Sequence, residues 1–177
     1  LRLTNSAGSG MTTRITSLGH AITLLGRRQL MRWLQLLLYS ATPGDEHGVS
    51  PLLQLAATRG RLMELLVDRC PEAPTGGREL IDQAYLTGIL SLMPALLGCP
   101  LALVLAELPV APAVQGALDA HAGVLGDLLR LVEALERDDT EALAAACARR
   151  PEIDAPFANA CLSRALGWAN NLAREAQ

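Results

Sequence analysis

Histidines and carboxylates would be the first residues to carry hydrolytic chemistry in this chain. A metal-dependent hydrolase needs several of them clustered. The chain has only His20, His47 and His121, none is followed by aspartate, and no two share a predicted helical face. The sequence also lacks lysine, a Gly-rich phosphate loop and a Gly-x-Ser-x-Gly motif. These absences exclude P-loop, Schiff-base and nucleophile-elbow mechanisms, so we predict no catalytic residue, cofactor or metal from spacing.

The strongest basic cluster consists of Arg27, Arg28 and Arg32. Arg28 and Arg32 are four residues apart, so they are neighbours on the surface of a helix. Paired guanidinium groups can hold a phosphate or a partner's carboxylate. The same spacing is more typical of a solvated surface strip, which we favour, and a partner or anion contact at these three arginines is the alternative.

The acidic run from Glu133 to Glu141 and the four cysteines are the remaining polar features. The run could bind a cation, but it places no Gly or Asn where a calcium loop needs one. We therefore interpret it as a solvated junction between helices. The cysteines, at positions 70, 99, 147 and 161, form no Cys-x-x-Cys motif and lie in apolar or Ala-rich segments. We expect buried free thiols, typical of a cytoplasmic protein.

Composition limits the kind of protein that can position these residues. Half of the 177 residues are hydrophobic, only 3% are aromatic, and the net charge is −3. Such a chain is not disordered, can bury a core of aliphatic side chains, and has no general affinity for nucleic acid. Arginine is concentrated in the first half and the acids in the second, which suggests two faces or subregions.

Apolar spacing predicts an all-α protein, because no segment alternates with the period of a strand. Residues 83–106 are uncharged, but Pro94, Gly98 and Pro100 interrupt them, which favours short buried helices over a membrane span. Ser50-Pro51 and Asp139-Thr140 are typical helix starts. Gly88 either allows close helix packing or is merely tolerated in its helix. The predicted helices cover about 18–25, 27–40, 51–70, 78–93, 94–98, 101–107, 112–121, 123–137, 140–149 and 154–175, with a turn at 74–77.

Several motifs in this order resemble the HDOD family, the HD-related output domains. The family pattern L-R-x-x-N-S, a loop, then I-x-S-x-x-x-A-I-x-x-L-G is matched by Leu1, Arg2, Asn5, Ser6, Ile15, Ser17, Ala21, Ile22, Leu25 and Gly26. Residues 84–90 resemble its A-F-x-x-G-L-L helix. Residues 101–118 and Trp168-Ala-Asn-Asn171 are similar to the region beyond the core in bacterial EAL–HDOD signalling proteins.

The resemblance implies a compact multi-helix HD-like fold without its metal site. HD-type hydrolases place a His-Asp pair after the A-F-x-x-G-L-L helix, and the degenerate pair positions here are Ser91 and Leu92. Arg59 falls about where an upstream histidine ligand would lie, and its charge would repel a metal. The fold is therefore expected, and phosphohydrolase activity is not.

The resemblance also implies an organisation and a role. Residues 1–110 would form the HDOD core and residues 111–177 a C-terminal helical extension packed on it. The chain reads as a fragment whose opening helices and an EAL-type domain lie upstream, so uncovered helices could pair in a homodimer. We expect a non-catalytic, cytoplasmic signalling output module of a cyclic-di-GMP-related regulator that contacts protein partners. The alternatives are a degenerate metal-dependent phosphohydrolase and a sensor of anionic nucleotides.

Overall fold

The computed structural model describes residues 51–98, 100–106 and 110–175. These residues form helices and no strand, which confirms the predicted all-α class. The helices are α2 (Pro51–Val67), α3 (Ala73–Leu90), α4 (Met93–Leu97), α5 (Leu101–Ala106), α6 (Pro112–Ala120), α7 (Gly123–Glu136), α8 (Thr140–Arg149) and α9 (Ala155–Glu175). In the part of the chain so described, no helix combines the length and apolarity that a membrane crossing requires.

Most helix boundaries fall within a few residues of the prediction, and the two differences have local causes. α2 ends at Val67 instead of about Cys70, because Pro71 disfavours helical geometry in the residue before it. Beyond α2, the Arg69 amide bonds to the Leu66 carbonyl and the Cys70 amide to the Val67 carbonyl, each three residues back, as in a tighter turn. The predicted turn at 74–77 is instead the first turn of α3, interrupted at Gly77 (φ 53°).

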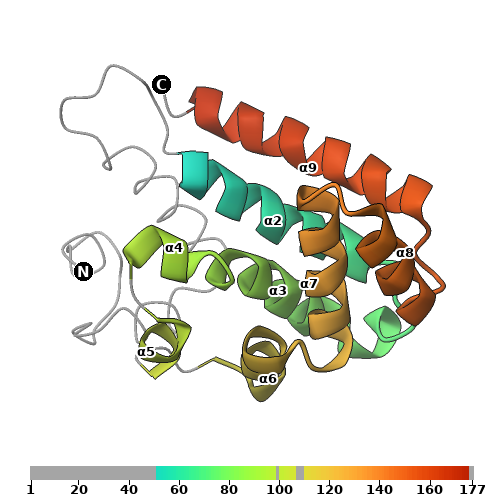
Figure 1. The fold of residues 1–177 in the computed structure, drawn as a ribbon, viewed down its shortest axis with the longest axis horizontal. Helices are drawn as coiled ribbons and strands as arrows, with labels where there is room; N and C mark the ends of the chain where they lie inside the picture. The colour runs from blue at the N-terminus through green and yellow to red at the C-terminus, as the bar shows by residue number, and fades with distance from the viewer. Residues whose placement is uncertain (1–50, 99, 107–109, 176–177) are drawn as a thin grey trace.

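One apolar core joins the helices. α9 runs antiparallel along α2, and α3 lies on the other side of α2 (Figure 1). α9 buries a narrow stripe made mainly of small residues, whereas α7 contributes larger leucines. The stripe consists of Ala158, Cys161, Ala165 and Ala169, spaced three or four residues apart as one helical face requires. The core includes residues from both sides of position 110, and the domain boundary predicted there stays a prediction.

The close crossing of α2 and α3 positions the site described below. A Cβ atom added to Gly88 would lie 2.7 Å from the Cα and N atoms of Gly60, so backbone meets backbone there. Only glycine permits this approach, which confirms the packing role predicted for Gly88. As a result, Arg59 on α2 lies opposite the end of α3.

Candidate functional site

A buried arginine lies at the α2–α3 crossing. Only 9% of the Arg59 side chain is exposed. Its Nη1 donates a hydrogen bond to the Ser91 Oγ at 2.7 Å, and its Nε donates to the Glu136 Oε1 at 2.9 Å. Its Nη2 bonds to the other oxygen of Glu136. The guanidinium is therefore held by a bidentate carboxylate and one hydroxyl, an arrangement that fixes its orientation.

Ser91 is the C-cap residue of α3, and its hydroxyl is engaged on both sides. The Oγ donates to the Gly88 carbonyl at 2.7 Å while it accepts from Arg59. Its backbone N–H bonds to the Thr87 carbonyl at 3.0 Å. Its one proton is committed to the Gly88 carbonyl, and among the described residues its other hydrogen-bond partner is the Arg59 guanidinium, which is no base. The hydroxyl is therefore better suited to orienting Arg59 than to nucleophilic attack.

Leu92, the second degenerate pair position, begins α4 as its N-cap residue. It is half-buried and offers no ligand atom. The structure therefore brings Arg59 and Ser91 together, and neither they nor Leu92 carries a group that binds a cation readily.

Glu136 enters this cluster from the last turn of α7, and 17% of its side chain is exposed. The interpretation of residues 133–141 as a solvated helix junction is wrong at this residue, because Glu136 turns inward to neutralise Arg59. Glu133 is partly exposed, and its Oε2 lies 3.2 Å from the His121 Nε2. Asp139 instead has the predicted role at a helix start, since its Oδ1 accepts from the Ala142 N–H at 2.9 Å.

A second buried arginine organises the far end of α2. Arg150 makes two hydrogen bonds to Glu72, at 2.7 and 3.1 Å, and its Nε lies 2.8 Å from the Glu152 Oε1. Together with the Cys70 Sγ, ligand atoms of both carboxylates lie within 4.8 Å of one another, so this is a formal metal-ligand cluster among the described residues.

The charge of Arg150 opposes a metal at this cluster. Its hydrogen bonds hold the pKa of Glu72 below the ordinary value, which shows the carboxylate already stabilised by a cation. Burial raises the pKa of the Cys70 thiol, so Cys70 stays protonated at neutral pH and is a poor ligand. Cys70, Cys147 and Cys161 are free cysteines; the first and last are buried, as predicted, whereas Cys147 is only half-buried, so the prediction of burial is wrong there. Cys99 lies outside the described residues.

The arginine cluster predicted from sequence, Arg27, Arg28 and Arg32, also lies outside the described residues, as do His20 and His47. His121 is described and ends α6 in the left-handed conformation, with φ at 50°. Sequence reasoning missed Glu136 and Arg150 as buried partners. One feature of the sequence could have indicated the partner of Arg59. Arg59 shares a helical face with the apolar Ala56 and Met63, and a charge on that buried face needs a carboxylate beside it.

Two known proteins are similar to this chain in sequence. The uncharacterized protein YuxH of Bacillus subtilis (strain 168) is 27% identical over 174 residues, which cover 97% of this chain and 40% of YuxH. The cyclic di-GMP phosphodiesterase CdgJ of Vibrio cholerae serotype O1 is 27% identical over 147 residues, which cover 83% of this chain and 32% of CdgJ. The chain thus spans well under half of each relative. Neither a protein-family model nor a solved structure matches it.

Proposed function

We propose that this chain is a non-catalytic output module of a bacterial cyclic-di-GMP-related signalling protein, acting through protein–protein contacts. The observation that carries the proposal is the hydrogen bond between Arg59 and Ser91. The HDOD resemblance places metal ligands of active HD hydrolases near these two positions. A fixed guanidinium here puts a positive charge where a hydrolase would hold its metal, and the paired Glu136 satisfies that charge.

The similarity to CdgJ supports the signalling context, because that relative is named a cyclic di-GMP phosphodiesterase. The aligned part is 32% of CdgJ, so we attribute the activity of that protein to no residue of this chain. We place an EAL-type domain upstream in the same parent protein, in the cytoplasm, and treat this chain as the part that contacts partners. A homodimer remains one form such a contact could take.

Measurements of bound metal and of hydrolysis test this proposal against the alternative, a metal-dependent phosphohydrolase. The chain would be incubated with Mg²⁺, Mn²⁺ or Fe²⁺, passed through a desalting column, and analysed for bound metal by mass spectrometry. The same samples would be assayed on cyclic di-GMP and on bis(p-nitrophenyl) phosphate. We expect no stoichiometric metal and no hydrolysis above the buffer blank.

A matched variant makes a positive result interpretable. If the chain retains one metal per molecule and hydrolyses either substrate, and Ser91→Ala or Glu136→Gln removes that activity, the non-catalytic proposal is wrong. A second arm measures binding of the chain to the separately purified upstream part of its parent protein by titration calorimetry. Saturable binding is expected, and no heat at high concentrations of both proteins would contradict the contact role.

A further inference from the structure

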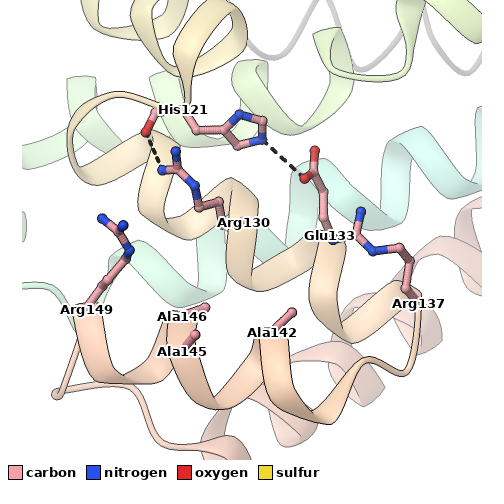
Figure 2. Close-up of a pocket in the computed structure, with 8 residues that line it drawn as sticks. All are labelled: His121, Arg130, Glu133, Arg137, Ala142, Ala145, Ala146 and Arg149. Carbon is pink, nitrogen blue, oxygen red and sulfur yellow. Dashed lines mark hydrogen bonds and ion pairs between the residues drawn. The ribbon is translucent and has the colours of Figure 1, made fainter.

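A pocket of about 410 Å³ lies between α7 and α8 (Figure 2). Its apolar floor is formed by three small residues of α8, Ala142, Ala145 and Ala146. Its polar walls come mainly from α7 and from the turn before it. The volume lies within the range of sites for small molecules, which favours a small ligand over a macromolecule.

Three arginines face this pocket, while a single carboxylate lines it. Arg130 and Arg149 lie toward one end, and Arg137 lies at the other (Figure 2). Glu133, the one acidic lining residue, is engaged with His121 at 3.2 Å. The lining side chains therefore carry an excess of positive charge, which the neighbouring Asp127, 3.7 Å from both Arg130 and Arg149, offsets in part.

The arginines keep donors available for a ligand. Arg130 and Arg149 each approach the Asp127 Oδ1 only to 3.7 Å, which is beyond hydrogen-bond length. Arg130 spends one donor on the His121 carbonyl at 2.7 Å, which fixes its direction. Arg137 forms no ion pair with any residue that the structure describes. Because a guanidinium has five N–H donors, most of this hydrogen-bonding capacity is unused.

Backbone contact makes the wall of the pocket rigid. A Cβ atom on Gly126 would lie 2.0 Å from the carbonyl carbon of His121, so the first turn of α7 packs directly on the preceding turn. That contact holds the His121 carbonyl that anchors Arg130. Arg130 is thus oriented before any ligand arrives, which lowers the entropic cost of ordering that side chain on binding.

We propose that the α7–α8 pocket binds a small phosphate monoester. Its phosphate lies between Arg130 and Arg149, where two guanidinium groups can each donate to a phosphate oxygen. Its organic group lies on the alanine floor and replaces water there. Arg137 adds positive charge at the opposite end. The site uses none of the residues of the Arg59 cluster, so it stands independently of the proposed function.

Titration calorimetry in Tris buffer at about 50 mM ionic strength, where electrostatic attraction is little screened, provides the test. The probes are phenyl phosphate, inorganic phosphate and phenol. We expect saturable binding of phenyl phosphate, weaker binding of inorganic phosphate and none of phenol. Arg149→Gln should weaken the binding of phenyl phosphate about tenfold, as expected for the loss of a charged hydrogen bond. Arg164→Gln, an exposed change on α9, is the matched control and should leave it unchanged.

A second pair of variants separates loss of the site from loss of the fold. Ala145 is exposed on α8, so Ala145→Glu and Ala145→Gln should both fold, which circular dichroism would check. The Glu variant adds a repelling charge and should bind phenyl phosphate much more weakly than the Gln variant. If phenyl phosphate showed no saturable binding up to about 10 mM, far above the micromolar range of specific sites, the proposal would be overturned. Equal binding of inorganic phosphate, or equal loss in Arg164→Gln, would overturn it too.

Discussion

Arg59 holds a full positive charge inside the apolar packing of α2, α3 and α7. Burying a charge is unfavourable unless hydrogen bonds and a counter-charge replace its hydration. Glu136 and Ser91 provide both, and all three hydrogen-bonding nitrogens of Arg59 are used. The arrangement therefore depends on each member, and removal of the arginine alone leaves a largely buried carboxylate without a partner.

Arg59→Ala should lower the free energy of unfolding by about 3 kcal/mol, because it leaves Glu136 uncompensated. Urea denaturation followed by circular dichroism measures the change. The double variant Arg59→Met with Glu136→Met removes both charges and should recover most of the loss. Arg78→Ala, an exposed change on α3, should stay within about 0.5 kcal/mol of the parent. If the double variant were as unstable as the single one, the ion pair would not be the cause.

At the scale of the helix, the α2–α3 crossing tolerates no added atom. The backbones of Gly60 and Gly88 meet directly, so an intruding methyl group cannot be absorbed by a side chain changing its rotamer. The helices themselves would have to separate, and that separation would also pull Arg59 away from Ser91. The crossing and the buried cluster therefore act as one structural unit.

Gly88→Ala should destabilise the protein by about 2 kcal/mol, since the added Cβ overlaps backbone atoms of α2. Gly167→Ala on α9 is the matched control, because a Cβ there meets no atom within 4 Å. That control should gain up to about 1 kcal/mol from the higher helix propensity of alanine. Thermal unfolding of the two variants distinguishes the effects. Similar behaviour of both would mean that the crossing is looser than described.

Local signals in the sequence predicted the helices well, because capping and proline rules act over a few residues. Asp139 caps the start of α8 and Pro51 begins α2, as expected. The interruption at Gly77 was missed, since a glycine after a proline fits either a turn or a kinked helix. The partners of Arg59 and Arg150 lie 77 and 78 residues away, and no local rule selects one carboxylate among many at that distance.

At the scale of the whole molecule, the two long-range ion pairs tie α2 and α3 to the C-terminal helices. Arg59 joins α2 to the end of α7, and Arg150 joins the end of α8 to Glu72, just before α3. The second pair is more accessible, since 45% of the Glu72 side chain is exposed. The contribution of this second pair to stability is therefore smaller. Because the Glu72 carboxylate titrates, that contribution can be measured separately through its dependence on pH.

Stability should depend on pH through Glu72. Its pKa is lowered in the folded protein by the Arg150 hydrogen bonds, so the stabilisation is complete above the ordinary glutamate pKa of about 4.3. It disappears as the pH falls through the lowered folded value. Glu72→Gln should be less stable than the parent at pH 7 by under about 1 kcal/mol, because the pair is screened by solvent.

Urea denaturation of parent and Glu72→Gln at about pH 7 and about pH 3.5, on either side of the glutamate pKa, tests this expectation. The difference between them should narrow at the lower pH. High salt at neutral pH should also narrow it. If the stability difference between the parent and Glu72→Gln widened in acid, the pKa of Glu72 would not be lowered in the folded protein.

The 77-residue separation of Arg59 and Glu136 also has a consequence for synthesis on the ribosome. At translation rates of about 5–20 residues per second, Arg59 is made about 4 to 15 seconds before Glu136. Until then its charge has no partner and favours water over the apolar crossing. We expect nascent chains halted before α7 to leave α2 open to protease, and chains that expose all of α7 to protect it. Protection of the shorter nascent chains would show that α2 and α3 pack without their counter-charge.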